Sequence, residues 1–356
     1  MASIQHRRAL AQGLHRPDGA DVAAITQRLL AVQAQDYRQA KLAVRARTAG
    51  LTAADVDAAM DDRTVVVSWF NRGTLHLVHR DDHAWLLGLT APTHERPLLK
   101  RLGDFDVGAD LADTLVDRIV TVLAQDGPLD RRTLAERLEA ARRRGEGLSV
   151  VHALGLSGAR GLTVRGPVVD GQQRYALTRD WLGTEPPAPL QGAERDLALA
   201  ELARRYLRGH GPAADRDLAK WAGLPLRDAR AGLSAIAGEL VPTDGDLVAL
   251  RGEAAEIEAA PSRLPARLLP MWDEMTVGYR DRALLLRAGD EHRFANRNGI
   301  VPAIVLHDGR AVGGWSLARA KGVTTATAEP WDDGGFGRSV GRAVTAECRD
   351  VTRFEG

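Results

Sequence analysis

The chain has 356 residues, 44% of them hydrophobic, and a formal net charge of +1; this length and composition predict a globular protein of several compact units. Its apolar runs fall short of the roughly 20 residues that span a bilayer, and its N-terminus has no secretory signal pattern, so we expect a cytoplasmic protein without a membrane partner. The single cysteine, Cys348, excludes an intramolecular disulfide framework and any multi-cysteine metal site. A charge this close to neutral does not by itself indicate nucleic-acid binding.

Residues 1–92 are predicted to form helices followed by a β-hairpin. Asp21 is a candidate N-cap for a helix whose apolar residues recur at helical spacing and whose end carries Gln33 and Gln35. The stretch TVVVSWFNRGTLHLVHRDD then changes to β-branched and aromatic residues on both sides of the turn Asn71-Arg72-Gly73. Helices followed by a hairpin predict a winged helix-turn-helix.

The same order of elements recurs twice. Residues 93–185 combine a helix over Leu111–Leu123, a break at Gly127-Pro128, a second helix in LDRRTLAERLEAARRR and strands around Asp170-Gly171. Residues 186–260, which the proline-rich linker TEPPAPLQG introduces, again place helical segments before strands. Repetition at this scale predicts two further winged helices.

Residues 261–356 change to strand-like runs, among them RALLLRAG, GIVPAIVLHDGRAVGGWSL and GVTTATAEPW, with Asp308-Gly309 as a hairpin signal. We therefore predict a small antiparallel β-barrel or half-barrel packed on the helical part. The expected fold class is α+β, with three tandem winged helix-turn-helix units and a C-terminal antiparallel β-barrel.

Most motifs of nucleotide and hydrolase chemistry are absent from the sequence. It has no phosphate loop ending in Lys-Ser/Thr, no GxGxxG after a strand and no HExxH, and Ser157 lacks the GxSxG context of a serine esterase. His76, His79 and His83 lie close together in the sequence, but in a strand His76 and His79 point to opposite faces. We therefore expect no metal site there.

The segment LLAVQAQDYRQAKLAVRAR is the most unusual part of the chain. Its two amides, Gln33 and Gln35, are separated by one small residue and could reach the same groove if the helix stops or tightens there. Arg38, Lys41, Arg45 and Arg47 supply nearby cations. The alternative is that both glutamines are solvated surface residues.

Three motifs carry a resemblance to a known family, and they follow one another over essentially the whole chain. They are Gln33-Ala34-Gln35; the segment SWFNRGTLHLV with Asn71, Arg72, Thr74 and His76; and LLPMWDEMTVGYRDR with Trp272, Asp273, Tyr279 and Arg282. In this order they resemble the AlkZ/YcaQ family of winged-helix DNA glycosylases.

The resemblance implies tandem winged helices and a C-terminal β-barrel that form a C-shaped clamp. It also implies that Gln33 and Gln35 are catalytic, because the glutamine–apolar–glutamine motif is catalytic in that family. The branch with two glutamines is associated with bulky antibiotic-derived adducts and interstrand crosslinks in actinobacteria, hence with DNA repair and antibiotic resistance. A monomer that acts on double-stranded DNA is the family-based expectation.

The chemistry of alkylated purines suits a neutral amide pair. A purine alkylated at N7 or N3 is positively charged and already a good leaving group, so no strong general acid is needed. The carbonyl oxygens of Gln33 and Gln35 can accept hydrogen bonds from a water held against the anomeric carbon. Their help is positional and electrostatic, so we expect a monofunctional glycosylase with no metal or organic cofactor that spares unmodified purines.

The remaining motif residues are predicted to hold DNA or the lesion. Asn71, Arg72, Thr74 and His76 would contact phosphates from the first wing. Trp272, Asp273, Tyr279 and Arg282 would line the lesion pocket or wedge the duplex, although Trp272 and Tyr279 could equally belong to the barrel core. Because a crosslinked base is hard to flip out of the helix, catalysis on an unflipped lesion is our preferred hypothesis.

Two other functional classes stay open from the sequence. The chain could be a non-enzymatic winged-helix regulator in which the glutamine motif is incidental, and such a protein would bind undamaged DNA sequence-specifically. It could also sequester a free alkylating antibiotic without DNA. Lys41 keeps a bifunctional glycosylase possible, because a lysine amine near the site could attack the sugar.

Overall fold

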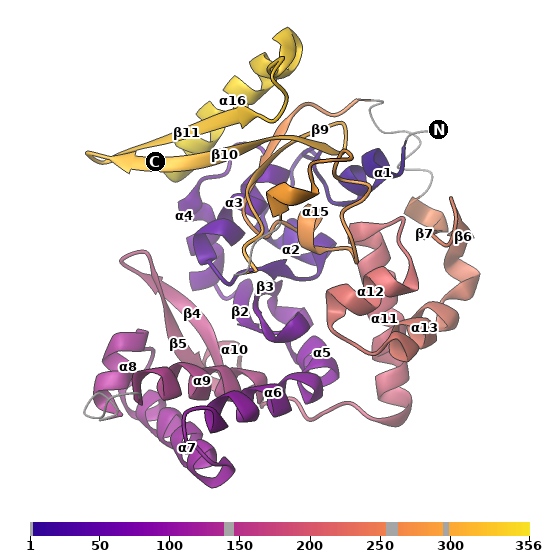
Figure 1. Cartoon of the computed structure of the whole chain (residues 1–356). Coiled ribbons are helices and arrows are strands. Elements are labelled where there is room, and N and C mark those ends of the chain that lie inside the picture. The colour runs from indigo at the N-terminus through magenta and orange to yellow at the C-terminus, as the bar shows by residue number, and fades with distance from the viewer. Residues whose placement is uncertain (1–2, 139–145, 254–262, 295–298) are drawn as a thin grey trace. The chain divides into compact units, whose positions relative to one another are not determined.

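The structure is a computed structural model that describes residues 3–138, 146–253, 263–294 and 299–356. Helices and antiparallel sheets give the α+β fold that the sequence predicts (Figure 1). The chain divides into two compact units, each described separately: the first unit is Met1–Val56, Leu199–Trp221 and Pro225–Gly356, and the second unit is Asp57–Ala198 with Ala222–Leu224. The four domain ranges predicted from the sequence stay predictions.

The second unit alternates helices with two hairpins. Its elements are β2 (Val65–Trp69), η1 (Asn71–Gly73), β3 (Leu75–His79), α5 (Arg80–Thr90), α6 (Pro92–Gly103), α7 (Ala109–Asp126), α8 (Arg131–Arg137), α9 (Glu146–Ala159), β4 (Thr163–Val169), β5 (Gln172–Leu177) and α10 (Thr178–Leu182). Both predicted hairpins are confirmed. Strand β2 also pairs with β4, so the two hairpins share one sheet in the order β3-β2-β4-β5.

Local sequence explains where these elements turn. Asp170 and Gly171 join β4 to β5 with φ values of 51° and 72°, the left-handed geometry of a tight hairpin turn. Gly127, with φ of 75°, ends α7. The predicted second helix is present as α8, and the part of that prediction over residues 139–145 lies outside the described residues.

The proline-rich linker has no helix or strand over residues 184–191, as expected. It is nevertheless packed, because Leu190 N donates to Gly88 O at 3.0 Å. A Cβ atom on Gly88 would lie 2.9 Å from Ala188 O, so only glycine lets this segment approach α5 so closely. The linker is therefore held against the helix.

The first unit combines helical segments from both ends of the chain with a C-terminal sheet. Its elements are α1 (Ile4–Ala11), α2 (Val22–Leu29), β1 (Val32–Gln33), α3 (Tyr37–Arg47), α4 (Ala53–Asp61), α11 (Gly192–His210), α12 (Asp215–Ala222), α13 (Leu226–Ala235), η3 (Ala237–Glu239), β6 (Leu240–Pro242), β7 (Val248–Leu250), β8 (Arg267–Leu269), α15 (Glu274–Val277), η4 (Glu291–Phe294), β9 (Ile304–His307), β10 (Arg310–Ala320), β11 (Val323–Pro330) and α16 (Gly337–Glu355). Among the described residues, helices precede the hairpins β2–β3, β4–β5 and β6–β7, and the assignment of each group as a winged helix stays a prediction.

The C-terminal sheet differs from the predicted barrel. Its strand order is β11-β10-β9-β8, an open sheet in the part of the chain that the structure describes. Asp308 and Gly309 form the predicted turn, with φ values of 47° and 76°. Strands of 3 to 11 residues are too few and too unequal for the regular stagger that closes a barrel.

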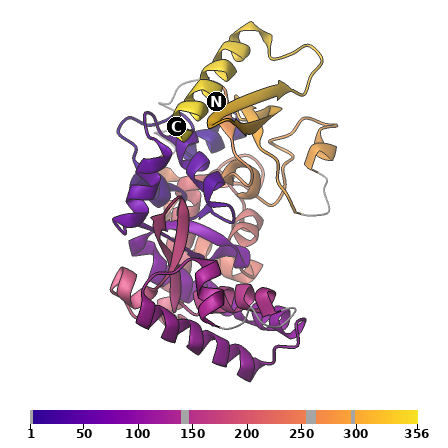
Figure 2. The same ribbon diagram turned by 90° about the vertical axis from the view of Figure 1, so that its left-hand side faces the viewer.

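Helix α16 covers the C-terminal sheet and was not predicted. It lies along β11 and β8 (Figures 1 and 2). Its buried residues follow helical spacing but include a carboxylate, so the apolar stripe is interrupted; they are Val344, Glu347, Val351 and Phe354. The predicted strand in RALLLRAG is also wrong: Leu285 and Leu286 are buried in turns and pack in the core with α1 and β9.

Candidate active site around Gln33 and Gln35

Gln33 and Gln35 lie in an extended segment between two helices. Helix α2 ends at Leu29, Leu30 turns the chain with φ of 66°, and Val32–Gln33 form the short strand β1. The prediction that the pair lies at a helix end was therefore wrong. Burial alternates along the segment, with Val32 and Ala34 inside, Gln33 half-buried and Gln35 exposed, so both amides lie on its outer side.

Asp36 fixes the start of the next helix. Its Oδ1 accepts hydrogen bonds from Arg38 N at 2.9 Å and Gln39 N at 3.4 Å, which is the geometry of an N-cap. An exposed carboxylate in this role accounts for Asp36 without giving it a part in the chemistry.

A buried carboxylate, Glu274, holds the backbone of Gln33. Gln33 N donates to Glu274 Oε1 at 3.2 Å, and Trp221 Nε1 donates to Glu274 Oε2 at 2.8 Å. His210 Nε2 lies 3.3 Å from the same Oε2. The Glu274 and His210 side chains are fully buried, where a carboxylate is costly unless donors surround it. The segment MWDEMTVGY therefore contributes to this site through Glu274, a residue that was not predicted from the sequence.

Asp273, the residue before Glu274, is a buried carboxylate paired with an arginine. Arg47 contacts it with two nitrogens, at 2.8 Å and 2.9 Å, and neither side chain is exposed. Asp273 Oδ1 also accepts from Met275 N and so caps α15. Asp273 joins α3 to the start of α15, because a buried guanidinium needs a paired anion. Its predicted contact with the lesion stays a prediction.

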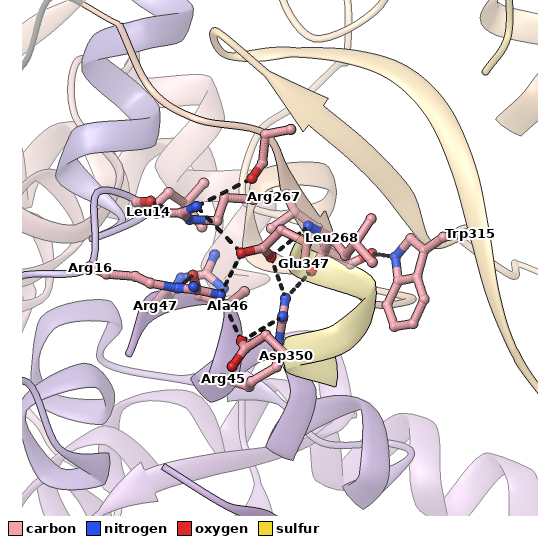
Figure 3. A network of polar contacts seen from close by, with 12 residues as sticks. Leu14, Arg16, Arg45, Ala46, Arg47, Arg267, Leu268, Trp315, Glu347 and Asp350 are labelled. Atoms are coloured by element: carbon pink, nitrogen blue, oxygen red, sulfur yellow. Dashed lines mark hydrogen bonds and ion pairs between the residues drawn. The ribbon is translucent and has the colours of Figure 1, made fainter. Parts of the chain in front are cut away.

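Arg45 likewise belongs to the interior. It is 1% exposed and contacts Glu347 Oε2 at 2.9 Å and Asp350 Oδ2 at 3.0 Å. Figure 3 shows Arg16 reaching both carboxylates and Arg267 reaching Glu347. Both carboxylates belong to α16. In this structure the charge of Arg45 ties α3 to the C-terminal helix, and its predicted DNA contact stays a prediction.

Charge crowding shifts several groups in this network. Burial, together with the neighbouring Arg16, lowers the pKa of Arg267 to about 10. Burial also lowers the pKa of Arg16. Burial alone would raise the pKa of Asp350, but its hydrogen bond to Arg353 and the charge of Arg45 lower it overall. The Asp350 carboxylate therefore stays ionised beside the arginines.

Arg38 and Lys41 remain near the surface of α3, directly after the glutamines. Arg38 Nη2 pairs with Glu355 at 2.6 Å and keeps 40% of its side chain exposed. Lys41 Nζ lies 5.1 Å from the centre of the Tyr37 ring. These are the predicted cations beside the glutamines that the structure leaves accessible.

The third motif divides between core and surface. Tyr279 is 7% exposed; its hydroxyl accepts from Gln12 Nε2 at 3.2 Å and donates to His210 O at 3.0 Å. Burial raises the pKa of Tyr279, so its phenol stays neutral in the core. Trp272 and Arg282 are half-buried, and their nitrogens donate to backbone carbonyls.

The hairpin motif lies in the second unit, and half of it is buried. Asn71 and His76 have no exposed surface in this structure, and their predicted contact with phosphate stays a prediction. Arg72 and Thr74 are half-buried at the turn. Arg72 has φ of 58°, an uncommon conformation for a residue other than glycine that the surroundings must hold in place. A Cβ atom on Gly223 would lie 2.8 Å from Arg72 N, so Gly223 packs directly on this turn.

A cavity of about 410 Å³ adjoins Arg72 within the second unit, and Arg101, His94 and His152 also line it. Burial, and then the charge of Arg72, lower the pKa of His94 to about 4. His94 is therefore neutral near pH 7, and the positive charge of this cavity comes from its arginines. Arginines at such a position suit a phosphate.

The residues that the structure describes contain neither a cluster of metal ligands nor a membrane-spanning helix. Among them, no group of three or more His, Cys, Asp or Glu side chains is placed to hold a metal ion. No helix there combines the length and the apolar character needed to cross a membrane.

Comparison with known proteins extends these observations. The model of the family described as DNA glycosylase AlkZ-like matches residues 26–354. An "Interstrand DNA cross-link repair glycosylase" of Streptomyces sahachiroi is 28% identical over 365 residues, which cover 96% of this chain and 92% of that protein. The solved structure of the Streptomyces sahachiroi DNA glycosylase AlkZ matches with a TM-score of 0.77 and 24% identity, over 99% of this chain and 97% of the other. The structural match supports a shared fold.

Proposed function

This chain belongs to the AlkZ-like DNA glycosylase family, and from that premise we propose that it excises purines alkylated at N7 or N3 from duplex DNA by hydrolysing the N-glycosidic bond. The supporting observation is that Gln33 and Gln35 lie on the outer side of one short segment whose backbone is bonded to the buried Glu274. A rigidly held amide pair can position a water without being charged.

The proposed roles of the two glutamines follow from amide chemistry. Their carbonyl oxygens accept hydrogen bonds from the attacking water and face the positive charge that develops on the sugar. The cationic base leaves without a protein acid. Unmodified purines, whose departure requires protonation, are then poor substrates.

The substrate range is also part of the proposal. The Streptomyces relative is described as an interstrand cross-link repair glycosylase, and the exposed position of Gln35 suits a lesion too large to leave the helix. We infer that bulky adducts and crosslinks are processed without flipping of the base. Fluorescence of 2-aminopurine placed beside the lesion tests this, because flipping would unstack the probe and raise its emission.

A monofunctional reaction is proposed, with water as the nucleophile. Lys41 is the lysine nearest to the glutamines in sequence, and its ammonium faces the Tyr37 ring. Borohydride should therefore trap no covalent protein–DNA complex. A trapped complex that Lys41→Ala abolishes would contradict the proposal and indicate an associated lyase.

The first experiment is release of 7-methylguanine from methylated duplex DNA by the wild type and by Gln33→Ala and Gln35→Ala. Gln27→Ala is a matched control, because Gln27 is exposed on α2. We expect release to fall at least about 100-fold in both site variants, the scale of losing one positioned polar group, with DNA affinity retained. Binding without release by the wild type would contradict the proposal and favour a DNA-binding regulator.

A further inference from the structure

Helix α16 carries a row of exposed arginines that the proposed reaction does not use. They are Arg338, Arg342, Arg349 and Arg353. At about 100° per residue, the four lie within an arc of about 60° of the helix, opposite the residues that α16 packs on the sheet. This outward side, the arginine face, extends about 17 Å from Arg338 to Arg349, because a helix rises about 1.5 Å per residue.

The acidic residues on the inner side of α16 do not offset this charge. Glu347 is buried and Asp350 is half-buried. Three arginines from other elements contact these two carboxylates: Arg16, Arg45 and Arg267. Because the inner side already has more guanidinium groups than carboxylates, it leaves no negative charge to neutralise the arginine face.

Helix stability does not account for the arginine face either. Among the described residues, Arg353 alone of the four is paired with a carboxylate, that of Asp350, at 2.7 Å. Arg338 lies in the first turn of α16, which has no acidic residue, and a cation at that end of a helix opposes the helix dipole. Exposed guanidinium groups in a row are suited instead to contacts with phosphates.

The chemistry of the arginine face favours a nucleic-acid backbone over a membrane. The other exposed residues on this side are Thr345 and Ala346. These six positions include no large apolar side chain of the kind with which a helix enters a lipid surface. One strand of duplex DNA carries a phosphate about every 3.4 Å along its axis, so about five phosphates match the length of about 17 Å.

The arginine face belongs to the same compact unit as the glutamine pair. Glu355, at the end of α16, pairs with Arg38 at 2.6 Å, and Arg38 follows Gln35 by three residues. Arg353 Nη1 donates to Gly50 O at 3.1 Å, beyond the other end of α3. Both ends of α3 are therefore joined to α16, and DNA on the arginine face is held by the unit that carries the glutamines.

We propose that the arginine face of α16 is a sequence-independent docking surface for undamaged duplex DNA. The inference rests on the proposed action on DNA and adds a surface that is separate from the glutamines. Phosphate contacts at this surface raise the affinity for any duplex, while base release still depends on Gln33 and Gln35.

Three variants test the docking surface. The first, the glutamine triple, changes Arg338, Arg342 and Arg349 to glutamine and removes three charges from the arginine face. The second, the lysine triple, changes the same positions to lysine and keeps the charges. The matched control removes three exposed arginines from other segments of the first unit and so changes the net charge equally: Arg251→Gln, Arg263→Gln and Arg310→Gln.

Affinity for short undamaged duplexes of two unrelated sequences is measured by fluorescence anisotropy from about 50 to 200 mM salt. Each lost phosphate contact reduces the slope of log affinity against log salt by about 0.9, so the glutamine triple should lose about 2.7 of this slope. Its affinity at the lowest salt should fall at least about tenfold on both sequences. The lysine triple and the matched control should keep the wild-type slope, and all variants should melt like the wild type because the changed side chains are exposed.

A second measurement separates docking from chemistry. With DNA saturated by excess protein, the glutamine triple should release 7-methylguanine at the wild-type rate, because Gln33 and Gln35 are unchanged. An unchanged salt slope in the glutamine triple, or an equal loss in the matched control, would overturn the inference and leave the glycosylase function standing.

Two further outcomes are informative. Vesicles that contain phosphatidylserine might be bound by the wild type and not by the glutamine triple while DNA affinity is equal in both; this result would overturn the inference in favour of a membrane surface. If the wild type bound duplexes with the expected slopes but released no base, the docking surface would be supported and the proposed function would fail.

Discussion

The contact between Glu274 and the backbone of Gln33 makes a sharp prediction for Glu274→Gln. The substitution keeps the shape of the side chain but replaces one carboxylate oxygen with an NH₂ donor. Trp221 Nε1 faces one oxygen at 2.8 Å and Gln33 N faces the other at 3.2 Å. Both are donors only, so in either amide orientation one N–H faces another N–H.

The magnitude follows from the burial of the groups involved. Hydrogen bonds to a charged acceptor contribute about 1.5–3 kcal/mol, and an unsatisfied buried donor costs about 1–3 kcal/mol. Because the Glu274 side chain is fully buried, we expect Glu274→Gln to lower the free energy of unfolding by about 2–4 kcal/mol. Displacement of Gln33 should also slow base release about 10- to 100-fold, because catalysis is sensitive to shifts near 1 Å.

The assay combines thermal unfolding with single-turnover release of 7-methylguanine below the unfolding midpoint. Trp221→Phe is the matched control, because it removes a donor to Oε2 and leaves the contact between Oε1 and Gln33. It should lose stability yet release base nearly as fast as the wild type. Base release by Glu274→Gln at the wild-type rate would refute the reasoning. An equal loss of the release rate in Trp221→Phe would refute it too.

Three further predictions concern stability. Asp273→Asn should lower the free energy of unfolding by about 3–5 kcal/mol, because it leaves the buried Arg47 without its anion; a melting midpoint close to wild type would contradict this. Burial lowers the pKa of His83 and His94 from 6.5 to about 4. As the pH drops from 6.5 towards 4, the two histidines therefore bind protons in the unfolded chain before they do so in the folded one. The free energy of unfolding should fall over this range by up to about 1.4 kcal/mol per pH unit for each histidine. Unfolding of His94→Gln across this range should be less pH-dependent. Gly209→Ala should destabilise the first unit and slow base release, because its Cβ would lie 2.4 Å from a backbone carbonyl of α2; unchanged unfolding in denaturant would count against that packing.

The burial of a charged residue could not be predicted from the sequence around it. Arg38, Lys41 and Arg45 recur at helical spacing and look alike in the sequence. The structure leaves the first two near the surface and buries Arg45 against Glu347. The carboxylate that decides this comes from α16, about 300 residues along the chain, so no local pattern could separate the three cations.

Features that depend only on neighbouring residues could be predicted from the sequence. Hairpin turns at Asp170-Gly171 and Asp308-Gly309 follow from residues that tolerate positive φ, and the N-cap at Asp21 follows from one side-chain oxygen. The glutamine motif could be recognised in the sequence because it too consists of adjacent residues, Gln33-Ala34-Gln35.

The surroundings of the glutamine motif depend on contacts between distant parts of the chain. Glu274 contacts Gln33 across 241 residues of sequence, and Arg47 meets Asp273 across 226. In place of the predicted barrel, the structure has an open sheet covered by α16. Hydrogen bonds and ion pairs between distant residues depend on how the whole chain packs, and a buried charge gives no local sign of its partner.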